Sequence, residues 1–300
     1  MEEKELGKVY SVMALGILGV SFSAVFIRLT EAPSTIIAMY RMIFTLVIFT
    51  PLVIKKGGIS FTSIGVKGIG LSLLSGFFLA LHFTAWIESL KHTTIASSTV
   101  LVSLQPLFTA TLGYLLYKEG LSRGQILGMG IAIVGSVFIG FSDFISGGGS
   151  LYGDWLAVLG GAFASVYVLL GRGLRRTLAN LDYVYLAYGS CSITLLGFNV
   201  VGRTPVTSYG GSDYLIFLGL AVFSTIGGHT VFNWALKYVE ANKVSTAMLG
   251  EPIGATILGF LILQEIPTEA QLLSGLIILL GLYIFIKDSF RRKNITTPLS

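Results

Sequence analysis

The chain alternates between long apolar stretches and short connections that carry most of its charged residues. A helix needs about 20 mostly apolar residues to cross the roughly 30 Å hydrocarbon core of a bilayer. Ten stretches of this sequence meet that length, at 9–29, 34–54, 67–89, 94–117, 123–141, 152–171, 182–202, 213–236, 243–263 and 269–287. The sequence therefore predicts an all-α integral membrane protein with ten transmembrane helices.

The composition agrees with a chain that faces lipid over most of its area. Only 12% of its residues are charged and 53% are hydrophobic, whereas a soluble domain carries roughly 25% charged residues. The net charge of +5 comes from short Lys and Arg clusters between apolar runs. That pattern is typical of membrane topology and not of a phosphate-binding surface. We expect contact with the lipid bilayer and no nucleic-acid partner.

The positions of the basic residues predict the orientation. With the N-terminus inside, sixteen of the twenty Lys and Arg residues fall on the inner side, three fall outside and Arg41 lies within a span. Cytoplasmic connections carry an excess of Lys and Arg. We therefore expect a multi-pass protein of the cell (cytoplasmic) membrane with both termini in the cytoplasm.

Several residues recur at a spacing of 146 positions, which indicates an internal repeat. Pro106 matches Pro252, Gly113 matches Gly259, and Gln125 matches Gln271 at this spacing, as do Glu119 and Glu265. We place the two repeats at 1–146 and 147–300, with five spans in each. Because each repeat has an odd number of spans, the second repeat enters the membrane from the opposite side. This inverted arrangement is common in secondary transporters.

The stretch from Ala96 to Glu119, with Gln105-Pro106 inside it, and its partner from Ala241 to Glu265, with Glu251-Pro252, resemble a known family. They look like the drug/metabolite transporter superfamily, specifically its ten-helix EamA-type members. The resemblance implies two inverted five-helix repeats around a small-molecule site. It implies a secondary transporter, exporting amino acids or related small metabolites across the cytoplasmic membrane by alternating access.

Two other classes of function were weighed against transport. A membrane-embedded enzyme acting on lipid needs a catalytic cluster at one interface, and a non-transporting scaffold needs long loops or soluble domains for its partners. The sequence has neither feature, and it has no phosphate-binding loop, nucleophile elbow or paired metal motif. Its single cysteine, Cys191, excludes an intrachain disulfide. We expect no enzyme activity, no cofactor and no metal.

The proline-containing pairs Gln105-Pro106 and Glu251-Pro252 are the first candidates for a site near the middle of the membrane. Proline removes a backbone donor, and paired helix interruptions in two repeats point to a central binding site. A buried carboxylate is costly, so Glu251 is a candidate for substrate binding or for carrying a coupling proton. The alternative is that both pairs are helix kinks that only shape packing.

Three more pairs of residues are candidates for substrate binding. Arg41, next to Tyr40, would bind a carboxylate, pair with Glu88 or Glu251, or extend to the outer interface. The other two pairs are His82 with Trp86 and His229 with Asn233. The two residues of each pair are four positions apart, so they lie on the same face of their helix. For these the alternatives are a packing histidine, an interfacial tryptophan and interhelical hydrogen bonds.

Glycines concentrate in the fifth span, where Gly124 and Gly128 have the spacing that lets helices approach closely. We assign them to packing, either within the chain or in a homodimer. The fifth and tenth spans would then support a central cavity lined by the other eight.

Overall fold

The computed structural model describes residues 3–59, 61–117, 121–146, 151–174, 177–235 and 247–296. Its first half contains α1 (Glu3–Arg28), α2 (Ser34–Lys55), α3 (Phe61–His92), α4 (Ile95–Val102), α5 (Gln105–Tyr117) and α6 (Arg123–Ser146). Its second half contains α7 (Leu151–Leu174), α8 (Asn180–Val201), α9 (Gly211–Gly219), the π-helix η1 (Leu220–His229), α10 (Thr230–Ala235), α12 (Gly250–Leu263) and α13 (Glu269–Thr296).

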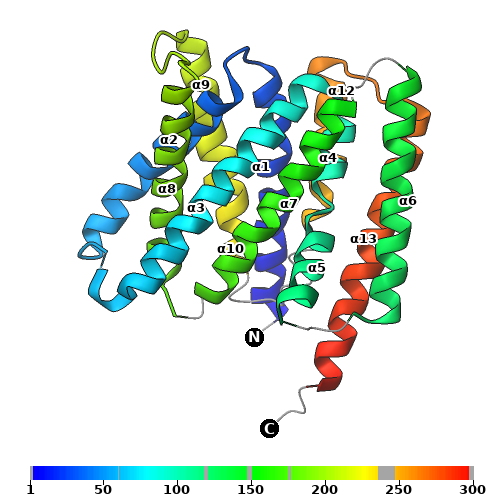
Figure 1. Ribbon diagram of the computed structural model, residues 1–300, viewed down its shortest axis with the longest axis horizontal. Helices are drawn as coiled ribbons and strands as arrows, with labels where there is room; N and C mark the ends of the chain where they lie inside the picture. Colours follow the sequence, from blue (N-terminus) through cyan, green and yellow to red (C-terminus); the bar gives the residue numbers. More distant parts are fainter. Residues whose placement is uncertain are drawn as a thin grey trace.

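The helices run roughly parallel or antiparallel in one bundle, as Figure 1 shows. Nine segments of the described residues are long and apolar enough to cross a membrane, with α4 and α5 together forming one of them. The shorter α12 supplies the tenth crossing. The predicted fold class is confirmed: an all-helical membrane protein with two inverted five-helix repeats. The start of the expected ninth span, residues 243–246, lies outside the described residues.

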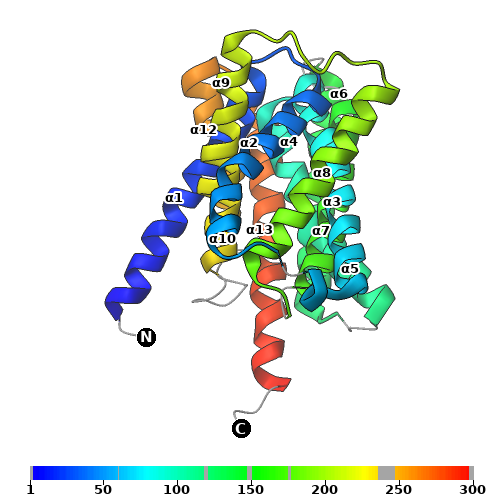
Figure 2. The ribbon, with the colours of Figure 1, turned by 90° about the vertical axis from the view of Figure 1, so that its left-hand side faces the viewer.

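The two chain ends lie at the same end of the bundle in both views (Figures 1 and 2). We call this the termini end, and the opposite end, where α1 finishes at Arg28, the far end. At the termini end, Gly57 and Gly58 have φ angles of +95° and +87° after α2. Glycine adopts this left-handed region without a Cβ clash, so the Gly-Gly pair allows the sharp turn into α3.

The expected fourth span is broken, which corrects the expectation of one helix over 94–117. Thr94 begins α4 by accepting a hydrogen bond from the Ser97 amide at 3.1 Å. The helix ends at Val102, and after two intervening residues α5 starts at Gln105, with Pro106 in its first turn. Proline fits a first helical turn because the amide it lacks has no partner there. Pro106 therefore starts a new helix and does not kink a continuous one.

The second repeat has the same interruption. A turn at Leu249 precedes α12, and Pro252 lies in the first turn of that helix. Both repeats thus carry a helix break at equivalent positions, each directly before a proline. The repeat boundary at residue 146 stays a prediction.

The expected eighth span is also irregular. It begins as the α-helix α9, continues as the ten-residue π-helix η1 and ends as α10. The glycines Gly19 of α1 and Gly228 of η1 allow the two helices to touch, since an added Cβ would come within 2.6 Å of the Phe223 carbonyl oxygen and 2.5 Å of Val20, respectively. π-helical segments occur frequently at functional sites.

Helices α6 and α13 pack along their length at one side of the bundle (Figure 1). A Cβ on Gly128 would lie 2.6 Å from the Gly281 carbonyl oxygen, and one on Gly281 would lie 2.6 Å from the Ala132 amide nitrogen. The glycines expected to serve packing therefore do so inside the chain. A homodimer remains a prediction.

Candidate functional site

Arg41 lies inside the bundle on α2, with no exposed surface. Its Nε donates a hydrogen bond to Thr225 Oγ1 of η1 at 2.8 Å, and its Nη1 donates to Ser23 Oγ of α1 at 3.3 Å. The guanidinium carbon lies 4.5 Å from the centroid of the Phe83 ring, a cation–π contact. Extension of Arg41 to the membrane interface is therefore excluded, because three elements enclose its side chain.

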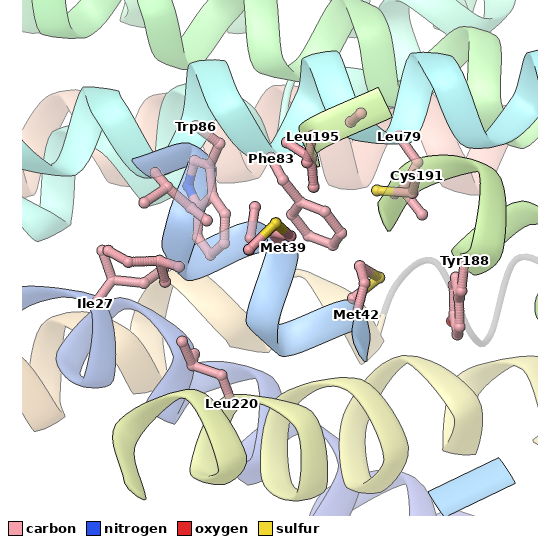
Figure 3. Close-up of a cluster of buried hydrophobic side chains, with 14 of the residues drawn as sticks. Ile27, Met39, Met42, Leu79, Phe83, Trp86, Tyr188, Cys191, Leu195 and Leu220 are labelled. Carbon is pink, nitrogen blue, oxygen red and sulfur yellow. The ribbon is translucent and has the colours of Figure 1, made fainter. Parts of the chain in front are cut away.

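The surroundings of Arg41 are largely apolar. Phe83 and Trp86 from α3, Met39 and Met42 from α2, and Leu220 from η1 belong to one buried cluster (Figure 3). Such a region excludes water, so electrostatic interactions within it are stronger than at a surface. A charged ligand group that reached Arg41 would therefore interact strongly with it.

Arg41 forms no ion pair with a carboxylate among the residues that the structure describes. Glu88, one expected partner, instead accepts hydrogen bonds from Ser34 and lies 3.1 Å from His92 Nε2 at the far end. The ring centroids of His82 and Phe83 lie 5.0 Å apart, and His229 follows Thr225 by four positions in η1. Glu251 belongs to α12, which packs against α1. These predicted residues thus lie on the elements around the Arg41 guanidinium, which we call the centre.

Three buried donors near this centre lack a hydrogen-bond partner in the part of the chain that is described. They are Arg41 Nη2, Trp86 Nε1 and Ser224 Oγ. Leaving a buried polar group unpaired costs about 1–3 kcal/mol, and more when it is charged. A ligand or a water molecule is therefore the expected partner of each unpaired donor.

His82 and Trp86 share a face of α3, as predicted. Their rings are nearly parallel, with an interplanar angle of 5° and centroids 6.1 Å apart. The His82 Nδ1 lies 2.9 Å from the Gly160 carbonyl oxygen of α7, and Trp86 is 4% exposed. Trp86 is therefore not an interfacial residue, and the pair offers two flat rings next to the centre.

The remaining candidates differ in their positions. Glu251 is partly buried in α12, and its carbonyl oxygen accepts a hydrogen bond from Ser21 Oγ at 3.4 Å. Gln105 is partly buried at the start of α5. His229 ends η1, and Asn233 lies in α10, where its side chain is outside the described residues.

Tyr40 points away from this centre. Its hydroxyl donates to the Val206 carbonyl oxygen at 2.7 Å, and its ring stacks on Phe217 with centroids 5.4 Å apart. With Met39 and Val206 it also lines an apolar cavity of about 230 Å³ between α2 and α8. Ile193 of the same cavity is 72% exposed, so the cavity opens on the bundle surface and not toward Arg41.

The sequence-based reading missed the residues that hold Arg41 in place. Ser23, Phe83 and Thr225 contact the guanidinium from three elements. Small hydroxyl residues inside apolar spans, such as Ser23 and the Ser224-Thr225 pair, are the signal that marks such positions. Serine and threonine are too common in membrane helices for that signal to identify a site alone.

This architecture, with irregular helices and a polar centre enclosed by an apolar bundle, defines a polytopic helical membrane transporter. The chain belongs to the EamA-like transporter family, whose model matches residues 7–141 and 151–287. The two matched segments correspond to the two repeats. This confirms the resemblance to the drug/metabolite transporter superfamily.

Two similar proteins carry names that describe them as transporters. An uncharacterized transporter of Archaeoglobus fulgidus is 26% identical over 192 residues, which span 63% of this chain and 67% of that protein. The riboflavin transporter ImpX of Fusobacterium nucleatum is 22% identical over 203 residues, 66% of this chain and 67% of that protein. A solved crystal structure has the same fold, with a TM-score of 0.65 at 15% identity, over 97% of this chain and 99% of the other.

Proposed function

We propose that this protein is a secondary transporter that exports amino acids or related small metabolites carrying a carboxylate. The observation that carries the proposal is the buried guanidinium of Arg41, which has an unpaired Nη2 and no carboxylate partner among the described residues. A guanidinium offers donors in a fork that matches a carboxylate. The substrate carboxylate would complete the hydrogen bonds that the protein leaves open.

The neighbouring residues suggest how the rest of a substrate would be bound. Trp86 Nε1 and Ser224 Oγ are unpaired donors, and the His82–Trp86 pair presents ring faces. Glu251 would bind the ammonium group of an amino acid or carry the coupling proton. Because one relative is named a riboflavin transporter, riboflavin belongs among the solutes to be tested.

Transport by alternating access is supported by the inverted repeats and their matching helix breaks. The breaks before Pro106 and Pro252 place two short helices, α5 and α12, at equivalent positions in the two repeats. Two similar halves in opposite orientation can exchange conformations and open a central site to either side in turn. This proposal contains no chemical step, so the protein would not be an enzyme.

We further propose that the termini end faces the cytoplasm. The basic residues of the connections concentrate at this end in the sequence. Reporter fusions after Gly57 and after Gly148 should report the cytoplasm and the outside, respectively. The same side for both fusions would contradict the ten-helix topology.

Transport by the purified protein in sealed vesicles tests the function. Vesicles loaded with single amino acids, other carboxylates or riboflavin should release one class of solute faster than protein-free vesicles. We expect release of carboxylate-bearing solutes and competition among them. If release is restricted to solutes without a carboxylate, the protein is a transporter but the proposed substrate class is wrong.

A further inference from the structure

Two buried carboxyl groups meet at the far end of the bundle, away from Arg41. Asp143, near the end of α6, has no exposed surface, and Asp154, in the first turn of α7, is 5% exposed. The two carboxyl groups lie on either side of the Thr93 hydroxyl, within hydrogen-bonding distance of it. Neither forms an ion pair with a Lys, Arg or His among the described residues.

Counting hydrogens shows that the pair lacks donors. The Thr93 hydroxyl lies 2.7 Å from Asp154 Oδ1 and 3.3 Å from Asp143 Oδ2, but it has one hydrogen and donates to one oxygen at a time. Asp143 also accepts hydrogen bonds from Ser97 Oγ at 2.6 Å and from Gln271 Nε2 at 2.5 Å. Asp154 Oδ2 has no partner in the part of the chain described.

The unequal donor supply determines which carboxyl group takes a proton. Asp143 receives two donors of its own, from Ser97 and Gln271. Asp154 has the shared hydroxyl and an unpaired oxygen, and it pairs with no Lys, Arg or His of the described chain. Two neighbouring carboxylates in such a site cannot both remain ionised without strong repulsion, and one shared proton relieves it.

We propose that Asp143 and Asp154 form a proton-binding site that holds one proton and joins the two repeats at the far end. Thr93 and Ser97 lie in the first segment that the family model matches, and Asp143 follows that segment by two residues on α6, whereas Asp154 and Gln271 lie in the second segment. In the protonated state, the proton lies between the two carboxyl groups. When the proton is released to water, two negatively charged carboxylates face each other and weaken the contact between the repeats.

A proton fits this site better than a metal ion. The hydroxyls of Thr93 and Ser97 bond directly to carboxylate oxygens at 2.7 and 2.6 Å, so their hydrogens occupy the positions that a Na⁺ ion would take. A cation of that kind would have to displace both hydrogen bonds. The test below therefore includes Na⁺ as the competing ligand.

Other titratable groups at this end are already paired or lie at the surface. His92 of α3 pairs with Glu88, and Glu265 accepts hydrogen bonds from Arg28 at 2.7 Å and from the Ile95 amide at 2.5 Å. Three other titratable or charged groups lie at this end of the described helices that pack here. Lys91 donates a hydrogen bond to the Ala32 carbonyl oxygen, and the Tyr152 ring contacts the His92 ring. The third, Glu269, is exposed.

The termini end offers a comparison. There Asp288 of α13 accepts a hydrogen bond from Ser122, beside Gly124 of α6. This hydrogen bond also joins the two repeats, but it involves one carboxyl group, whereas the site at the far end has two. A shared proton requires two neighbouring carboxyl groups, so we expect a proton-dependent contact only at the far end.

The test uses the full-length protein in lipid nanodiscs, with thermal unfolding and infrared spectra recorded across pH. The folded pair holds a proton that the unfolded chain releases, so stability is present at low pH and is lost as pH rises. The wild type should show this fall together with loss of a carboxylic-acid carbonyl band.

Asp154→Asn places an amide donor where the proton lies. It should abolish both the infrared change and the alkaline loss of stability, while the matched control Glu269→Gln behaves as wild type. Should Asp154→Asn fail to fold, Thr93→Val gives a second readout. It removes a donor to the carboxylates, so it should move the transition to higher pH.

Three results would overturn the proposal. One is an identical pH profile in wild type and Asp154→Asn, and another is an unmoved transition in Thr93→Val. The third is stabilisation by Na⁺ at constant pH that Asp154→Asn removes, which would identify a metal site. Because none of these measurements involves transport, they are independent of the proposed substrate.

Discussion

Three elements enclose the charge of Arg41, whereas α6 and α13 meet through glycine and place their polar contacts at the two ends. The central elements include a π-helix, and the neighbouring spans are broken before a proline. By contrast, α6 is continuous over 24 residues. We therefore assign binding and rearrangement to the central region, as proposed above, and rigid support to the α6–α13 pair.

If this contrast is correct, changes in the central region should alter transport at normal folded yield. Changes in the α6–α13 pair should alter folded yield and leave transport per folded molecule unchanged. The three predictions below test that division, beginning with the largest expected effect.

Arg41→Gln should abolish most transport of a carboxylate substrate. Hydrogen bonds to a charged group contribute about 1.5–3 kcal/mol, so substrate affinity should fall about 10- to 100-fold. Folding should survive, since replacing a buried unpaired charge by a neutral group is often neutral or stabilising. Substrate binding to the purified protein measures the effect.

Arg203→Gln is the matched control, because Arg203 is an exposed arginine in the connection after α8. It should bind substrate as the wild type does. Normal affinity in Arg41→Gln would contradict the assignment of Arg41 to the substrate and leave it a structural residue.

Glu251→Gln should reach the membrane folded but lose most transport or lose the pH dependence of transport. Glutamine keeps the shape and much of the hydrogen-bonding capacity of glutamate but cannot ionise. It also recreates the residue that the first repeat has at Gln105. Vesicle transport across pH, with and without an imposed proton gradient, measures the change. An unchanged rate and pH profile would assign Glu251-Pro252 to the helix break alone.

Gly128→Ala should lower folded yield while substrate selectivity stays the same. The added Cβ would lie 2.6 Å from both the Gly281 carbonyl oxygen and the Phe285 amide nitrogen, which forces the helices apart at a cost of about 1–3 kcal/mol. Gly130→Ala on the same helix is the control, since its Cβ would meet nothing within 4 Å. Thermal unfolding in detergent compares them. Equal stability of the two variants, or altered selectivity in Gly128→Ala, would remove the contrast between the two regions.

Much of the fold follows from the sequence because membrane helices are specified locally. Length and hydropathy set the number of spans, and the spacing of 146 between Pro106 and Pro252 identifies the repeat. An amphipathic spacing also predicts that His82 and Trp86 share a face, which their stacked rings bear out. Each of these features depends on a pattern within one or two helices.

The tertiary structure decided the features that depend on partners far apart in the chain. Arg41 donates to Thr225, 184 positions away, and Asp143 and Gln271 meet across 128 positions. Whether a buried donor is satisfied depends on which helix faces it, and helix periodicity contains no information about that neighbour. For the same reason the sequence predicted α4 and α5 as one helix, and it did not reveal the Asp143–Asp154 pair. Hydropathy thus determined which segments cross the membrane, while packing between helices determined which polar groups meet inside it.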